Sequence, residues 1–192
     1  CEAAIAGGVN LSLHPNKYLL LSQRRFLSSD GRCRSFGDGG DGYVPGEGVG
    51  AVLLKPLERA VADGDHIHAV IKASAVNHGG RTSGYSVPGP LAQGDVVAEA
   101  LAAAGVDPRS LSYLEAHGTG TSLGDPIEIV GLVRAFEQVG GAPQRCAIGS
   151  VKSNIGHAES AAGIAGLTKV LLQMRHGELA PSLHAGTLNP HI

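Results

Sequence analysis

The sequence predicts an α/β fold in which buried strands alternate with helices. Three observations lead to this class. Short, unbroken apolar runs recur along the chain, as buried strands do. Glycine-rich loops separate these runs, and the 29 glycines among 192 residues are about twice the usual share. Finally, the residues with reactive side chains stand where the runs end, which is where α/β folds build their sites.

The first part of the chain predicts two strands and a short helix. Residues 3–9 and 49–54 are apolar and unbroken, so each predicts a buried strand. Between them we expect a helical or irregular stretch over 18–26. A glycine-rich loop with three acidic residues follows over 36–50. Residues 58–63 predict a short helix.

The middle of the chain predicts a strand, a loop and a helix. Residues 67–76 alternate in polarity, which favours a strand. Residues 79–94 are polar and rich in glycine and proline, so we expect a loop there. Residues 95–104 repeat alanine and valine at helical spacing, and Gly105 is a suitable residue to end that helix.

The last third repeats strand, loop and helix more clearly. Residues 111–116 and 146–151 predict strands, and each runs into a small-residue loop. Asp125 precedes a proline at a favourable first-turn position, so we expect it to be the N-cap of a helix. Residues 158–176 predict the longest helix, which ends at Gly177. The residues on its apolar side are Ile164, Leu167, Val170, Leu171 and Met174.

Composition limits the setting and the partners. The formal charge of −2 argues against a nucleic-acid partner, which would require a basic stripe. No apolar run is long enough to span a bilayer, so we expect no membrane partner. Three cysteines without metal-ligand spacing favour a reducing, cytoplasmic setting. Because the chain opens at Cys1 directly into an apolar run, we expect an internal piece of a longer polypeptide.

Two histidines occupy matched positions. His117 and His157 each follow a predicted strand, lie among small residues and precede a helix, and Lys152 stands near the second. One such histidine alone would favour a loop residue bonded to backbone, whereas the pair favours a site. The positive end of the following helix disfavours a charged His157. A neutral imidazole there would donate a hydrogen bond to developing negative charge.

Other motifs favour structural roles. The glycines of 46–50 resemble part of a dinucleotide loop, but they precede a strand where a helix is required. A Schiff base on Lys152 would need a cofactor phosphate site, and no such signal accompanies it. Cys33 stands between two arginines, which should lower the pKa of its thiol. We expect no metal site, because His66 and His68 lack a third ligand and the acidic residues of 36–50 lack calcium spacing.

The motifs around the two histidines carry a resemblance to a known family. Residues 115–121 and 151–157 resemble the β-ketoacyl synthase domain of modular polyketide synthases. Four further segments match in order, namely 6–10, 30–33, 41–48 and 124–128. The run 77–85 is most similar to assembly lines whose acyltransferase is a separate protein. Residues 89–93 read Gly-Pro-Leu-Ala-Gln where the family usually has Asn-Pro-Asn-Ala-Gln, which affects the substrate pocket and not the chemistry.

The resemblance implies a partial thiolase-like fold, with a buried mixed sheet and helices on both faces. Residues 1–65 would be the end of its N-terminal half and residues 66–192 most of its C-terminal half. The family's nucleophilic cysteine lies in a Thr-Ala-Cys-Ser-Ser motif, which this sequence lacks. Cys1 aligns downstream of that motif, so it is not the nucleophile. The final strands of the family's domain would also be absent, and we expect the piece alone to be inactive.

The resemblance also implies a reaction: decarboxylative Claisen condensation of an acyl thioester with a malonyl-type extender. His117 and His157 would bond the extender's thioester oxygen, and Lys152 would orient them. Thr119 and Thr121 would line the channel for the phosphopantetheine arm, with Asp125 supporting the loop. The domain would bind no metal or cofactor of its own. Its partners would be acyl carrier protein domains, other polyketide synthase domains and a second copy in a homodimer.

The sequence leaves three other interpretations to consider. A non-condensing ketosynthase-like domain would hold or pass acyl chains, but such domains typically lose the histidine of the His-Gly-Thr-Gly-Thr motif, and His117 is present. A thiolase would carry a late Cys-x-Gly pattern, which Cys146 and its neighbours do not supply. The third is that the piece alone does nothing, because missing strands would leave open sheet edges.

Overall fold

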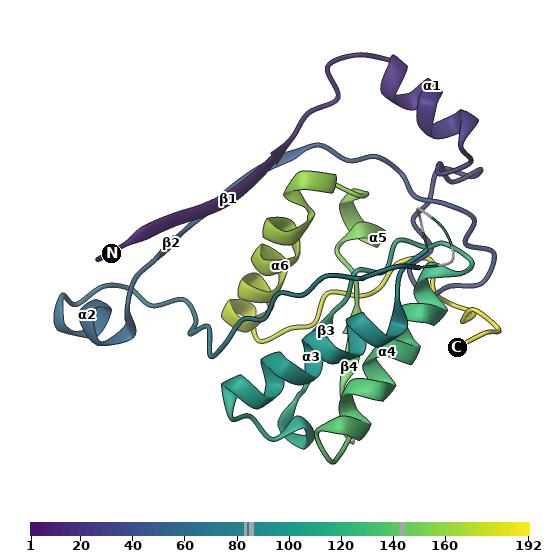
Figure 1. The fold of residues 1–192 in the computed structure, drawn as a ribbon. Helices are drawn as coiled ribbons and strands as arrows, with labels where there is room; N and C mark the ends of the chain where they lie inside the picture. The colour runs from purple at the N-terminus through teal and green to yellow at the C-terminus, as the bar shows by residue number, and fades with distance from the viewer. Residues whose placement is uncertain (83, 85–86, 143–144) are drawn as a thin grey trace.

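The computed structural model describes residues 1–82, 84, 87–142 and 145–192 (Figure 1). Its first two strands, β1 (Ala4–Asn10) and β2 (Gly48–Leu54), form an antiparallel ribbon in which Ala4 lies opposite Leu54. Both strands were predicted. Their predicted burial is wrong, since Ile5 is 79% and Val49 81% exposed. The reason is that the ribbon packs against the last helix of the chain on one face only, while its other face is open.

Two short helices flank this ribbon in sequence. Helix α1 (Asn16–Gln23) follows β1, where a helical or irregular stretch over 18–26 was expected, and helix α2 (Leu57–Ala62) follows β2, as predicted. The predicted strand over 67–76 is wrong, because that segment has no regular secondary structure. A strand requires a neighbour that completes its ladder of hydrogen bonds. Within the described part of the chain, no segment pairs with 67–76.

The second half builds a parallel strand pair beside a pair of helices. Helix α3 (Pro90–Ala104), the 3-10 turn η1 (Pro108–Ser110) and strand β3 (Tyr113–Glu115) lead into helix α4 (Gly124–Gln138) and strand β4 (Ala147–Gly149). Strands β3 and β4 pair in parallel, with Leu114 opposite Ile148. Helix α3 ends at Gly105 in a left-handed conformation, as predicted. It begins earlier than predicted, because Pro90 suits a first helical turn.

Helices α3 and α4 lie side by side and touch through small residues (Figure 1). A Cβ atom built on Gly131 of α4 would lie 3.1 Å from Cβ of Gln93 and 3.3 Å from the carbonyl oxygen of Pro90, both in α3. Contacts this short leave no room for a larger side chain without displacement of one helix. Gly131 therefore sets how closely the two helices approach.

The chain closes with α5 (Lys152–Ile155), the 3-10 turn η2 (Glu159–Ala161) and α6 (Ala162–His176), which ends at Gly177 as predicted. The predicted apolar stripe of α6 is not its most buried side, because Met174 is 60% exposed. The buried residues of α6 are instead Gly166, Lys169 and Gln173. Lys169 is buried because its ammonium pairs with the Glu115 carboxylate of β3 at 3.1 Å.

The described helices are short. None of them combines the length and the apolar character that crossing a bilayer requires. The buried apolar residues are mostly small and come from α2, α3, α4, η2 and the loops that follow α1 and β4. They include Cys33, Phe36, Ala135, Phe136, Val151, Ala158 and Ala161.

Candidate active site

The structure brings the two predicted histidines together. His117 follows β3 and His157 follows α5, and their ring centroids are 5.4 Å apart with the planes nearly perpendicular at 84°. Lys152 opens α5 directly after β4 and is only 4% exposed. The parallel strands β3 and β4 therefore deliver His117 and Lys152 from the same edge of the sheet, as α/β sites are built.

His157 is held through both its backbone and its ring. Its backbone N–H donates to the Val44 carbonyl at 2.7 Å, and its backbone carbonyl accepts from the N–H of Gly46 at 2.9 Å. The Tyr43 ring packs against the imidazole with centroids 5.0 Å apart. The Nδ1 atom accepts the backbone N–H of Glu159 at 2.9 Å. In the neutral ring the proton must therefore be on Nε2, which leaves Nε2–H free to donate.

A carboxylate that sequence reasoning missed holds the His117 loop. The two oxygens of Glu128 accept the backbone N–H of His117 at 2.6 Å and of Gly118 at 2.8 Å. The Ser150 hydroxyl donates to the His117 carbonyl at 3.0 Å. Gly118 has φ +44°, and a Cβ there would lie 2.7 Å from Cβ of Ser150. The loop thus depends on glycine at this position and on Glu128 below it.

Asp125 holds two loops and does not cap its helix, so the N-cap prediction is wrong. Residue 123 is the N-cap, and Asp125 lies in the first turn, 2% exposed. Its carboxylate accepts the N–H of Phe36 at 2.6 Å and that of Gly120 at 3.2 Å. Phe36 is 89 positions away and Gly120 only five, so the carboxylate joins a distant loop to the one just before α4 instead of capping its own helix.

The two predicted threonines lie in the loop that Asp125 supports. The hydroxyl oxygens of Thr119 and Thr121 are 3.4 Å apart. Thr121 also accepts the backbone N–H of Gly124 at 3.1 Å, which joins the loop to the start of α4. Both residues are half-buried beside the histidine pair.

The electrostatics of the site keep both imidazoles neutral. Desolvation by the surrounding protein, and next the positive charge of Lys152, lowers the pKa of His117 to about 4, although the residue keeps an exposed surface. Burial, Lys152 and Lys17 lower the pKa of His157 to about 4 as well. The direction for His157 is as predicted, but burial is its main cause. Burial also lowers the pKa of Lys152 itself, and the carboxylates of Glu128 and Glu115 partly oppose that shift.

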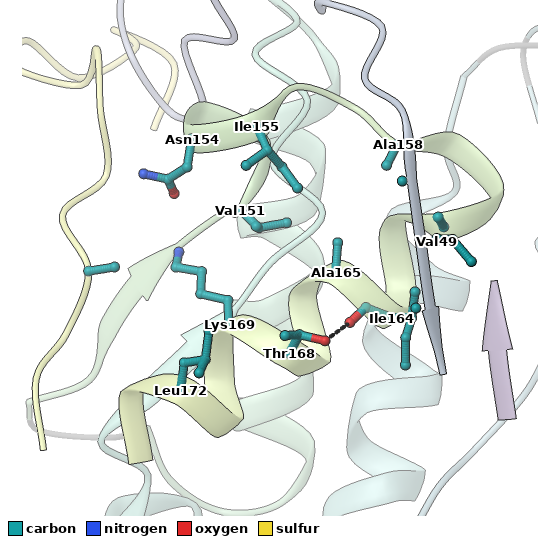
Figure 2. Close-up of a pocket in the computed structure, with 14 residues that line it drawn as sticks. Val49, Val151, Asn154, Ile155, Ala158, Ile164, Ala165, Thr168, Lys169 and Leu172 are labelled. Atoms are coloured by element: carbon teal, nitrogen blue, oxygen red, sulfur yellow. Dashed lines mark hydrogen bonds between the residues drawn. The ribbon is translucent and has the colours of Figure 1, made fainter. Parts of the chain in front are cut away.

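Two pockets adjoin the histidine-bearing loops. The larger, about 460 Å³, lies between β2, α5 and α6 and is lined mostly by apolar side chains, with the Lys169 side chain pointing into it (Figure 2). Neither histidine lines it. The smaller, about 360 Å³, is lined by His117, Lys152, Glu115 and one side of α6. We place the candidate site at the smaller pocket, because the titratable groups converge there.

The weaker motifs remain outside this site. Burial raises the pKa of the Cys33 thiol, so the predicted lowering is wrong; its sulfur accepts the N–H of Val44 at 3.1 Å. The rings of His66 and His68 touch edge to face at 4.5 Å. Among the described residues, no three side chains are grouped as a metal site would need. Ser83 and Tyr85 of the run 77–85 lie outside the described residues.

Comparison with known proteins identifies the family. Residues 1–60 match the N-terminal domain of β-ketoacyl synthases, and residues 68–186 match the C-terminal domain. The chain is 70% identical over its full length to polyketide synthase PksL of Bacillus subtilis and 70% identical to polyketide synthase ThaG of Burkholderia thailandensis. It spans only 4% and 3% of the lengths of those proteins.

Solved structures give the same result. The oxazolomycin ketosynthase domain OzmH KS7 of Streptomyces albus superposes with a TM-score of 0.96 at 66% identity. The ketosynthase from module 6 of the bacillaene synthase of Bacillus subtilis gives 0.95 at 46% identity. All of this chain is covered in both cases, and 34% of each ketosynthase chain. The chain therefore belongs to the β-ketoacyl synthase family and has part of the thiolase-like fold of polyketide ketosynthase domains.

Proposed function

We propose that this chain supplies the histidine pair of a ketosynthase that elongates polyketides by decarboxylative Claisen condensation. The observation that carries the proposal is the pair itself. His117 and His157 face each other at 5.4 Å, and burial and Lys152 hold the pKa of both well below neutral pH. Two neutral imidazoles this close to each other, one of which lines the smaller pocket, are suited to donate hydrogen bonds to an oxygen that becomes negative.

The proposed reaction has two stages. An acyl chain passes from the phosphopantetheine thiol of a carrier protein to a cysteine as a thioester. A malonyl-type extender on a second carrier then loses carbon dioxide, and the electron pair of the broken C–C bond moves onto the thioester oxygen. The resulting enolate carbon attacks the acyl-cysteine, forms the new C–C bond and expels the cysteine thiolate. The histidine donors stabilise the enolate oxygen, and loss of one such donor costs about 10² to 10³ in rate.

The other site residues take supporting roles in this proposal. Lys152 keeps the imidazoles neutral through its charge, Thr119 and Thr121 line the path of the phosphopantetheine arm, and Asp125 holds their loop. Acyl carrier protein domains deliver both substrates, and the domain needs no cofactor of its own. We further propose a cytoplasmic homodimer within a polyketide synthase whose acyltransferase is a separate protein.

The nucleophile of this reaction is not among the cysteines described. The family's Thr-Ala-Cys-Ser-Ser motif does not occur in the sequence. Cys33 is buried with a raised thiol pKa, and burial also raises the pKa of Cys146. We therefore propose that residues 1–192 alone neither load an acyl chain nor condense it, and that the complete domain does both.

His117→Ala and His157→Ala in the complete ketosynthase domain test the proposal. We expect acyl loading on the cysteine to continue while malonyl decarboxylation and the β-ketoacyl product disappear, because only the second stage develops charge on the extender oxygen. Mass spectrometry of the enzyme and of both carriers reads each stage separately. His176→Ala, in the exposed last turn of α6, is the matched control and should leave both stages unchanged.

Two results would contradict this assignment. Loss of loading in both histidine variants would mean that the imidazoles act on the nucleophile. A wild-type domain that loads an acyl chain and never elongates it would belong to the non-condensing class, despite both histidines.

A further inference from the structure

We propose that the ion pair between Lys17 and Glu159 is a positioning device for His157. It would hold the turn whose backbone N–H fixes the imidazole, so that Nε2–H points at the extender oxygen. This inference rests on the proposed function for its catalytic consequence. Its structural part, the orientation of the imidazole, can be tested without any turnover.

The turn after His157 has a conformation that needs external support. Glu159 donates its backbone N–H to Nδ1 of His157 at 2.9 Å. It does so with φ +42°, in the left-handed region that residues with a side chain rarely adopt. Such a conformation persists where surrounding contacts enforce it. The Glu159 carboxylate has one such contact, since its Oε2 lies 2.9 Å from Nζ of Lys17, and both side chains are largely buried at 25% and 29% exposure.

The ion pair also closes a ring of contacts around His157. Nζ of Lys17 donates to Oδ1 of Asn10 at 3.4 Å, and Nδ2 of Asn10 donates to the Gly46 carbonyl at 2.7 Å. The N–H of Gly46 in turn donates to the His157 carbonyl at 2.9 Å. Glu159 completes the ring through Nδ1. The end of β1, the start of α1 and the glycine-rich loop are thus tied to the single residue His157.

Replacement of Lys17 or of Glu159 should shift the pKa of His157 in opposite directions. This difference distinguishes an ion pair that positions the ring from one that has no effect on it. The titratable groups that face His157 are Lys17 of α1, Lys152 of α5, Tyr43, Glu159 and His117. Removal of the Lys17 charge lets the pKa of His157 rise. Removal of the Glu159 charge leaves Lys17 unneutralised and lowers that pKa further. Both replacements loosen the same turn and therefore release the imidazole in the same way. They shift the pKa of His157 in opposite directions.

The test uses Lys17→Met and Glu159→Gln in the complete ketosynthase domain. We expect acyl loading to remain at the wild-type rate in both variants, and kcat for malonyl decarboxylation to fall roughly tenfold with little change in KM, since small misplacement of a catalytic group is costly. The acid limb of the pH–rate profile should move up in Lys17→Met and down in Glu159→Gln. Lys17→Arg should retain activity. Lys55→Met, which removes a surface ion pair with Asp63 and Asp65, is the matched control.

A second readout does not depend on turnover. Diethyl pyrocarbonate acylates neutral imidazole nitrogens, and mass spectrometry gives the rate at His157. We expect that rate to rise severalfold in Lys17→Met and Glu159→Gln relative to wild type and to Lys55→Met, because the ring loses its fixed orientation. Unchanged reactivity at His157 in both variants would overturn the inference, whether or not the domain condenses. Altered reactivity in a domain that never elongates would support the inference and contradict the proposed function.

Discussion

At the scale of single residues, burial of the Lys152 ammonium opposes folding. A buried ammonium is unfavourable unless charges of opposite sign compensate it, and Glu128 and Glu115 lie near enough to do so. Its charge is the second cause, after burial, of the low pKa of each histidine. The lysine therefore acts on the imidazoles through its field, whether or not it touches substrate.

Lys152→Met keeps most of the side-chain volume and removes the charge. We expect the complete domain to fold and to condense more slowly. Without the lysine, the pKa of both histidines should rise from about 4 toward the ordinary value of about 6.5. The decarboxylation rate should then begin to fall at a higher pH than in the wild-type domain on the acid side, as the imidazoles take up protons. Wild-type turnover and an unchanged pH–rate profile would show that the Lys152 charge has no effect on the reaction.

Residue-level prediction succeeded where a signal is local and failed where a partner is distant. The matched contexts of His117 and His157 are visible in the sequence. The partner of Asp125 is the backbone of Phe36, which no local rule identifies. Glu128 could have been predicted as a site residue from its spacing. It stands three positions after Asp125 and so shares a helix face with it. Cys33 was misjudged because neighbouring arginines are visible in sequence while burial is not.

At the scale of elements, hydrophobic periodicity predicted where the helices lie better than it predicted which of their sides are buried. The ends at Gly105 and Gly177 follow from glycine's freedom in the left-handed region. The buried side of α6 does not follow from hydrophobicity, because Lys169 is drawn inside by Glu115. The segment 67–76 has the alternation of a strand, but strand formation also needs a neighbour that the pattern cannot show.

Gly131→Val tests the packing of α3 on α4. The added side chain meets Gln93 and Pro90 at the closest point of the two helices, so we expect destabilisation of about 1 to 3 kcal/mol. Thermal unfolding of the complete domain measures it. Val133→Leu, on the same helix at a position 52% exposed, is the control and should change the midpoint little. Equal midpoints for both variants would show that the helices separate at no cost.

At the scale of the whole molecule, the open face of the β1–β2 ribbon leaves apolar surface in contact with water. Large apolar side chains on it are exposed, among them Ile5, Val9, Val49 and Leu53. Exposed apolar patches of this kind bind partners or promote aggregation. We expect residues 1–192 produced alone to bind the dye ANS strongly and to show no acyl adduct on any cysteine after incubation with an acyl thioester. Weak dye binding and a stable acyl-enzyme would contradict both expectations.

The bonds that join residues 33–46 to residues 117–157 have a shared character. Phe36, Gly46 and Gly118 take part through backbone N–H or carbonyl groups, with Asp125, His157 and the Ser35 hydroxyl as their partners. Gly46 and Gly118 contribute only backbone atoms to these bonds, yet neither can be exchanged freely, because a Cβ on Gly46 would lie 2.6 Å from the Ile155 carbonyl oxygen and one on Gly118 2.7 Å from Cβ of Ser150. Variation among relatives is therefore expected to avoid these two positions, although neither residue contributes a side chain.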